Sequence, residues 1–169
     1  MVVVFATQQA AAEEKRIFLT SRAGNRVEVG KVDLKPAGDG YDFTVNIDGS
    51  GFVELYMEDR NFKCLAEEAW HYCYLPFLTE GRIADGDYKQ LEHALLFVRK
   101  SKNDVDLNPF NGVYFKIAKD GSTLVGKPRD VDLADVEAAN SQHPGTPIKE
   151  EDLHQGQPED YLFPTLSIE

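Results

Sequence analysis

The stretch YDFTVNID, residues 41–48, alternates apolar and polar side chains at every position, and this restricts what the chain can fold into. A period of two places successive side chains on opposite faces of an extended strand. A helix cannot collect such residues on one apolar face. The stretch therefore predicts an antiparallel strand whose buried face carries Tyr41, Phe43, Val45 and Ile47.

Turn-forming residues bound this strand and separate others like it. PAGDG (36–40) and DGSG (48–51) flank it, and FVELYMED (52–59) is predicted to return with Val53, Leu55 and Met57 facing inward. GVYFKIAKDGSTLVGKP (112–128) has the clearest hairpin pattern, with its turn at KDGS. The expected fold is mainly β: an antiparallel meander that closes into a small β-barrel or a β-sandwich, with one or two short helices. Closure would remove exposed strand edges.

The alternation changes parity within RVEVGKVDLK (26–35). Val27 and Val29 share one parity, whereas Val32 and Leu34 share the other. A shift of one residue would turn every later side chain to the opposite face unless the strand absorbs an extra residue. We therefore predict a β-bulge at Gly30.

The later part of the chain is less regular. LEHALLFVRK (91–100) fits a helix by the spacing of its leucines, or a buried strand through ALLFV (94–98), and we favour the strand because the run is short. DVDLADVEAAN (130–140) is predicted to form a short helix, and the proline-rich segment 141–160 a long surface loop. YLFPTLSIE (161–169) is expected to supply a last strand.

Size and charge limit the classes of function. The 169 residues suit one domain, which we place at 13–169. The net charge is −11, from 18 basic and 29 acidic side chains, and the sequence has no run of five basic residues. Such a field repels nucleic acids and anionic membrane surfaces, so neither is an expected partner. No apolar run approaches the roughly 20 residues that a membrane span needs.

The first twelve residues, MVVVFATQQAAA, combine a short apolar stretch with small residues before Glu13. This composition is typical of the end of a secretory signal peptide with a cleavage site after Ala12, although the positively charged start is missing. The alternative is a disordered leader before the first strand. A remnant signal would place the protein in the periplasm or outside the cell, and without one the protein would be cytoplasmic.

Both cysteines lie in FKCLAEEAWHYCYLPF (62–77). In an exported protein, two cysteines and no third predict a disulfide between Cys64 and Cys73. The alternatives are two unpaired buried thiols, or a metal site in which His71 and the distant His93 join the two sulfurs. A Cys73 nucleophile with His71 as its base has no further partner in the sequence.

Aromatic residues crowd the same stretch. On a strand, Trp70, Tyr72 and Tyr74 share one face, which is either core or the lining of a ligand cavity. The second interpretation adds the predicted inward residues of the hairpins. The candidate ligand-lining set is therefore Tyr41, Phe43, Val45, Trp70, Tyr72, Tyr74, Tyr114 and Phe115.

No nucleotide-binding glycine motif and no nucleophile elbow appears in the sequence, so no cofactor is predicted. The expected function is an exported, non-enzymatic binding module for an apolar small molecule or a protein partner. One alternative is a structural or interaction protein of the cell envelope. The other is a hydrolase that uses carboxylate or histidine chemistry.

Overall fold

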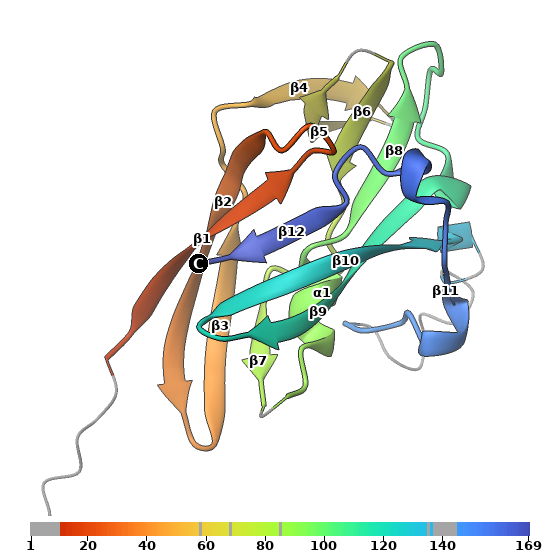
Figure 1. The fold of residues 1–169 in the computed structure, drawn as a ribbon. Helices are drawn as coiled ribbons and strands as arrows, with labels where there is room; N and C mark the ends of the chain where they lie inside the picture. The colour runs from red at the N-terminus through yellow and green to blue at the C-terminus, as the bar shows by residue number, and fades with distance from the viewer. Residues whose placement is uncertain (1–10, 58, 68, 85, 135, 137–144) are drawn as a thin grey trace, which may run out of the picture.

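The computed structural model describes residues 11–57, 59–67, 69–84, 86–134, 136 and 145–169 (Figure 1). These residues form one large antiparallel sheet of twelve strands with one short α-helix, so the prediction of a mainly β fold is confirmed. None of the described helices is long and apolar enough to cross a membrane.

Neighbouring strands along the sheet follow the order β4-β5-β6-β8-β9-β10-β12-β1-β2-β3-β7, and β11 pairs with β10 outside this path. The helix α1 spans Lys89–Ala94, and three short 3₁₀ helices are η1 (Pro109–Asn111), η2 (Glu150–Asp152) and η3 (Pro158–Asp160). The strands are β1 (Glu13–Thr20), β2 (Arg26–Ala37), β3 (Gly40–Asn46), β4 (Phe52–Met57), β5 (Arg60–Ala66), β6 (Trp70–Tyr74), β7 (Glu80–Ile83), β8 (Phe97–Ser101), β9 (Gly112–Asp120), β10 (Thr123–Val131), β11 (Leu153–His154) and β12 (Thr165–Ile168).

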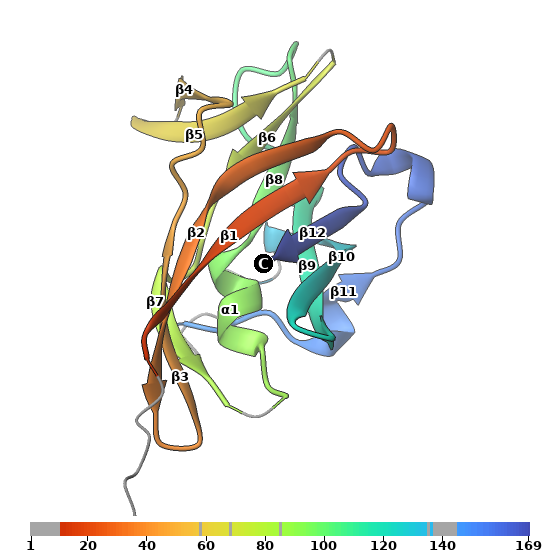
Figure 2. The same ribbon diagram turned by 60° about the vertical axis from the view of Figure 1, so that its left-hand side comes forward.

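The expected closure into a barrel is wrong. The sheet curls, but its end strands β4 and β7 pair with no further strand in the described part of the chain. The strands also belong to one hydrogen-bonded sheet rather than to the two sheets of a sandwich. Closure fails because α1, which follows β7, lies between β7 and β9 and contacts both (Figure 2). A helix occupies the gap that a barrel would fill by strand pairing.

The segment that fits both a helix and a strand contains one of each. Residues 89–94 are helical and β8 begins at Phe97, so the predicted strand over 94–98 starts three residues too early. Leu91, Ala94 and Leu95 are fully buried, and a spacing of three and four residues places them on one helix face. The leucine spacing thus indicates the helix, and the apolar run that ends in Phe97 and Val98 indicates the strand.

The predicted bulge in β2 is confirmed. Ile17 pairs with Gly30 and Phe18 pairs with Glu28, so Val29 has no partner on β1. This extra residue lets Val29 and Val32 both face the core despite their opposite parity. Gly30 is required here because a Cβ atom would lie 2.2 Å from the carbonyl oxygen of Asn46.

The main core fills the concave side of the curled sheet. It joins α1 to side chains from β1, β2, β3, β9 and β12. A second cluster, on the opposite face of β8, β9 and β10, includes Val98, Tyr114, Val131 and Ile148. A third surrounds the two cysteines and includes Met57, but Val53 of the edge strand is 42% exposed, which corrects its predicted inward position.

Cys64 and Cys73 form a disulfide, as predicted. They lie directly opposite each other on β5 and β6, with their Cα atoms 4.0 Å apart. The bond joins two strands of the part of the sheet that ends at β4, seen at the top of Figure 2. A disulfide is consistent with an oxidising, extracytoplasmic compartment.

Several predictions fall wholly or partly outside the described residues. Residues 1–10 of the predicted leader, 135 and 137–140 of the predicted helix, and 141–144 of the predicted loop belong there. The described remainder of the loop contains η2, β11 and η3. The expected last strand is β12, which pairs with β10 on one side and β1 on the other.

Replacement of Cys64 and Cys73 by alanine should lower the free energy of unfolding by roughly 2–3 kcal/mol, because the disulfide restricts the unfolded chain. Urea denaturation followed by tryptophan fluorescence measures this change. The unsubstituted protein treated with a reductant is the control and should show a similar loss. Equal urea midpoints for oxidised and reduced protein would contradict the stabilising role.

Replacement of Gly30 by alanine should destabilise the protein by about 1–3 kcal/mol, because the new methyl group overlaps the backbone of β3. Gly145 is the matched control, since the nearest atom to a Cβ there lies 3.8 Å away, at ordinary contact distance. Thermal unfolding of the two variants compares them directly. If Gly30→Ala and Gly145→Ala unfold at the same temperature, the close approach of the backbones at the bulge does not limit stability.

Candidate functional site

Most of the predicted ligand-lining residues are buried in the main core. Phe43, Val45, Tyr72 and Phe115 are almost fully buried there, and Tyr74 packs against the same cluster. The Tyr74 hydroxyl donates a 2.8 Å hydrogen bond to the carbonyl oxygen of Ala94, at the end of α1. These residues pack around α1 and one another, so the interior that they were expected to line is occupied by protein.

The other three predicted residues are separated from this group. Tyr114 faces the second cluster, on the side of β9 opposite to Phe115. Trp70, which is 43% exposed, begins β6, and Tyr41, which is 40% exposed, lies near the start of β3. These strand starts are at opposite ends of the molecule (Figure 1). The eight residues therefore do not line one cavity.

The residues of the predicted metal alternative are also dispersed. The sulfurs of Cys64 and Cys73 are joined in the disulfide and are not thiolate ligands. His71 lies on β6, and burial together with Lys100 and Lys102 lowers its pKa. His93 belongs to α1. Within the part of the chain that the structure describes, no group of three His, Cys, Asp or Glu side chains could hold a metal ion.

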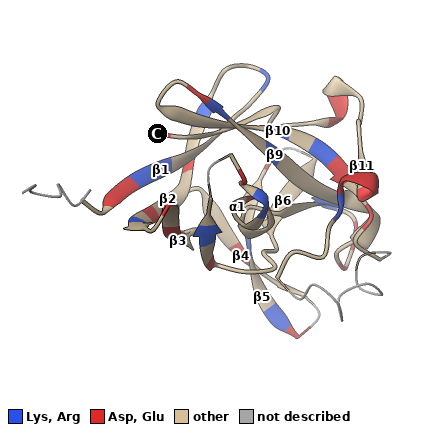
Figure 3. Ribbon diagram, turned by 90° about the horizontal axis from the view of Figure 1, so that it is seen from below, with Lys and Arg blue, Asp and Glu red and all other residues tan. Residues whose placement is uncertain are grey.

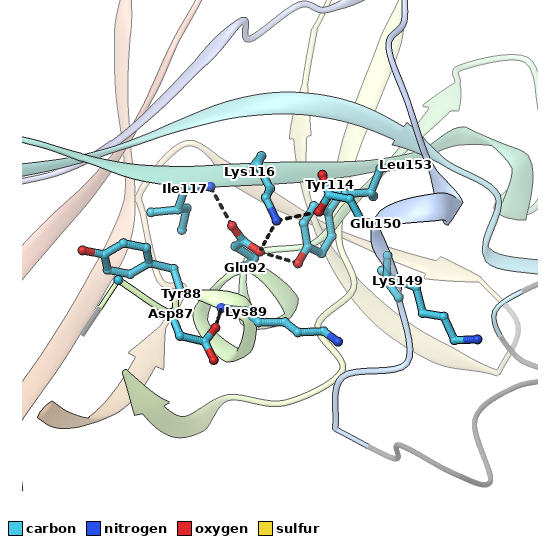
Figure 4. Close-up of a pocket in the computed structure, with 12 residues that line it drawn as sticks. Asp87, Tyr88, Lys89, Glu92, Tyr114, Lys116, Ile117, Lys149, Glu150 and Leu153 are labelled. Carbon is cyan, nitrogen blue, oxygen red and sulfur yellow. Dashed lines mark hydrogen bonds and ion pairs between the residues drawn. The ribbon is translucent and has the colours of Figure 1, made fainter. Parts of the chain in front are cut away.

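One hollow of about 260 Å³ lies beside α1 (Figure 4). Its floor contains Glu92, a carboxylate that is 2% exposed. A buried charge is costly unless hydrogen bonds and opposite charges compensate it. The residues around it are Gly86, Asp87, Tyr88, Lys89, Tyr114, Lys116, Ile117, Ile148, Lys149, Glu150 and Leu153.

The carboxylate of Glu92 is fully engaged within the protein. Its Oε1 accepts a 2.8 Å hydrogen bond from the backbone N–H of Ile117. Its Oε2 accepts a 2.6 Å hydrogen bond from the hydroxyl of Tyr114 and lies 3.7 Å from Nζ of Lys116. Lys116 also binds Glu150 at the rim, at 2.8 Å. Both oxygens of the buried carboxylate thus have partners (Figure 4).

The position of Glu92 explains why α1 forms where it does. β8 and β9 pair only at two positions, Phe97 with Val113 and Val98 with Gly112. Beyond them the two strands diverge, and the N–H of Ile117 is bound by the Glu92 side chain instead of a strand. On the opposite side of the helix, Oε1 of Gln90 accepts the N–H of Arg82 from the edge of β7. α1 therefore binds both edges of the gap.

His93 fixes the chain that covers this hollow. Its Nε2 accepts a 3.1 Å hydrogen bond from the backbone N–H of Ile148. That bond assigns the ring proton to Nδ1, which lies 2.6 Å from the carbonyl oxygen of Lys89 and donates to it. The imidazole is fully buried, and burial lowers its pKa to about 4. His93 is therefore neutral at pH 7 and holds Ile148 against the sheet.

The neighbouring ionisable groups have pKa values that favour structural hydrogen bonds over proton transfer at neutral pH. Burial, reinforced by the charge of Glu92, raises the pKa of Tyr114, which therefore stays a neutral donor. Burial alone would lower the pKa of Lys116, but its hydrogen bond to Glu150 and the charge of Glu92 outweigh burial and raise it. We interpret Glu92, His93, Tyr114 and Lys116 as a structural latch, and use that name below.

The free energy of unfolding should decrease as pH falls from 6.5, the ordinary histidine pKa, to about 4, the pKa of folded His93. In this window the unfolded chain binds the proton and the folded chain does not, which favours unfolding by up to the order of 3 kcal/mol. Urea denaturation at several pH values measures the decrease. His93→Gln should lose less stability than the unsubstituted protein over this window.

His154 provides the control for this measurement, because it is exposed. His154→Gln should retain the full decrease in unfolding free energy. The Asp and Glu side chains contribute equally to the pH dependence of the unsubstituted protein, His93→Gln and His154→Gln, so they cancel in the comparison. Identical pH profiles for His93→Gln and His154→Gln would contradict the assignment of His93 as the neutral buried group.

A second, larger hollow opens toward the end of the curled sheet, among residues of the β2–β3 hairpin, the end of β7 and the β9–β10 turn. This is the lower end of the molecule in Figure 1, and Figure 3 shows it from below. The hollow measures about 550 Å³, and we call it the basal cavity. It is lined by Glu13, Lys15, Leu34, Tyr41, Ile83, Tyr88, Lys119, Gly121, Ser122 and Leu124.

The lining of the basal cavity combines apolar and cationic side chains. Leu34, Ile83 and Leu124 supply its apolar surface, where the end of the main core meets solvent. An adjoining hollow of about 400 Å³ shares Tyr41, Ile83, Tyr88 and Lys119 with it. Of the predicted ligand-lining residues, Tyr41 alone lines the basal cavity.

Sequence reasoning missed the other members of this cavity. Lys15, Tyr88 and Lys119 come from segments far apart in the chain and match no motif. The inward position of Leu34 was predicted from parity, but its place at an open end of the core was not. The chain matches no protein-family model, no curated protein and no solved structure.

Proposed function

We propose that this protein is an exported, non-enzymatic binding module that holds a small molecule with an apolar body in the basal cavity. The observation that carries the proposal is an open hollow of about 550 Å³ lined by apolar side chains at the end of the core. Ligand cavities in proteins typically measure roughly 300–1,000 Å³ and are lined mainly by apolar and aromatic side chains.

The two tyrosines at the cavity suit such a ligand. Tyr41 is 40% exposed although it lies on a strand whose next inward residue, Phe43, is buried. Tyr88 packs partly against the main core and lines both hollows. Their rings offer apolar contact to a ligand while their hydroxyl groups remain near water.

Export to the periplasm or the cell exterior is part of the same proposal. The disulfide between Cys64 and Cys73 supports an oxidising compartment. The composition of residues 1–12 supports a secretory signal. A protein outside the cytoplasm that binds a small apolar molecule would keep it dispersed in water or deliver it to another component.

The hydrolase alternative has less support. The hollow beside α1 brings a carboxylate close to a histidine, but it contains the structural latch, in which both Glu92 oxygens and both His93 nitrogens are hydrogen-bonded within the protein. A catalytic acid or base needs an atom free to reach a substrate. The remaining alternative, an interaction protein without a small-molecule site, is the one that the following experiment tests.

A neutral fluorescent probe, N-phenyl-1-naphthylamine, should bind the protein with enhanced emission. Tyr41→Glu should weaken its binding about tenfold or more, because a carboxylate at the cavity must be desolvated when an apolar body binds. Tyr56→Glu is the matched control, since Tyr56 is a 69% exposed residue of the edge strand β4. It should leave probe binding unchanged.

Two results would overturn this proposal. One is the absence of a saturable increase in emission with the unsubstituted protein, which would favour the interaction-protein alternative. The other is equal weakening by Tyr41→Glu and Tyr56→Glu, which would place the probe elsewhere on the surface. Circular dichroism of both variants checks that each remains folded.

A further inference from the structure

The basal cavity has a charge balance unlike that of the whole chain. The protein carries a net charge of −11, yet the described residues that line this cavity include two lysines and one carboxylate. That carboxylate, Glu13, lies 3.1 Å from Nζ of Lys15 and is already paired. Asp39 of the adjoining hollow is bound by Arg82 at 2.9 Å. Among the residues that the structure describes, one positive charge at the cavity therefore remains without a counter-ion.

Lys119 carries this unmatched charge. It lies on β9 directly opposite Leu124 of β10, and directly opposed residues project to the same face of a sheet. Leu124 contributes to the apolar surface of the cavity, and Lys119 lines the cavity beside it. Lys119 is exposed, and its side chain makes no hydrogen bond or ion pair with any of the residues that the structure describes.

Lys15 brings a second ammonium to the same side of the cavity. Its Nζ lies 3.4 Å from the carbonyl oxygen of Ser122, in the turn between β9 and β10. Its side chain is only 16% exposed, so the stem is packed and the ammonium has a defined position. The contact links β1 to the turn that follows Lys119, and places two cations next to one apolar surface.

We infer that the ligand of the basal cavity is an amphiphile with an apolar chain and one carboxylate, such as a free fatty acid; this inference rests on the proposed function. In this arrangement the apolar chain of the ligand covers Leu34, Ile83 and Leu124. The carboxylate of the ligand binds the ammonium of Lys119, with Lys15 close by. One unmatched positive charge suits a monocarboxylate better than a phosphate monoester, which carries about −1.5 to −2.

Displacement of the naphthylamine probe by decanoate and by decan-1-ol tests the inference, because the two compounds share a chain and differ in the head group. At low ionic strength decanoate should displace the probe at about fivefold lower concentration, the upper range for an exposed ion pair. Lys119→Met should remove this preference, so that decanoate and decan-1-ol displace the probe from the variant at similar concentrations. Added salt should weaken displacement of the probe by decanoate and leave displacement by decan-1-ol unchanged.

Lys102→Met is the matched control, since Lys102 is an exposed lysine that follows β8 and does not line the cavity. It should keep the preference for decanoate. Equal displacement by both compounds, or an unchanged preference in Lys119→Met, would overturn the head-group inference while the cavity itself remains supported. Failure of both compounds to displace a bound probe would overturn the inference and the proposed binding of alkyl chains together.

Discussion

The architecture depends on the hydrogen bonds that the buried carboxylate of Glu92 accepts. Glu92 binds the edge of β9 at the point where β8 diverges from that strand, and its neighbour Gln90 binds the edge of β7. A helix of six residues has little stability alone, since its nucleus is costly. α1 therefore persists because its side chains complete hydrogen bonds that the sheet leaves open.

The place of α1 decides where a ligand can bind. The helix fills the concave side of the sheet with leucines, so the aromatic residues of the interior form core instead of a cavity. Space remains at the end of the curl, beyond Leu34 and Leu124. The same helix that prevents a closed barrel thus moves the candidate site from the centre of the fold to its lower end.

Period-two patterning predicted the strands, and its single break predicted the bulge at Gly30, because both features follow from which side of a strand each residue faces. Two cysteines and no third, under the hypothesis of export, predicted the disulfide. The barrel prediction failed because the helical residues 89–94 depend on contacts with β7 and β9, which no local pattern reveals. The cavity lysines, Lys15 and Lys119, come together only through the order of strands in the sheet.

The position of β12 has a consequence for how the molecule is built. This four-residue strand, near the end of the chain, forms hydrogen bonds with β10 and with β1, close to the start. Without it the sheet would fall into two blocks, one with β1, β2, β3 and β7, the other with the remaining long strands. Contacts so distant in sequence slow folding. Assembly of the complete sheet therefore requires β12 to pair on both sides, and a chain in which β12 has not yet docked exposes the facing edges of β10 and β1 to its neighbours.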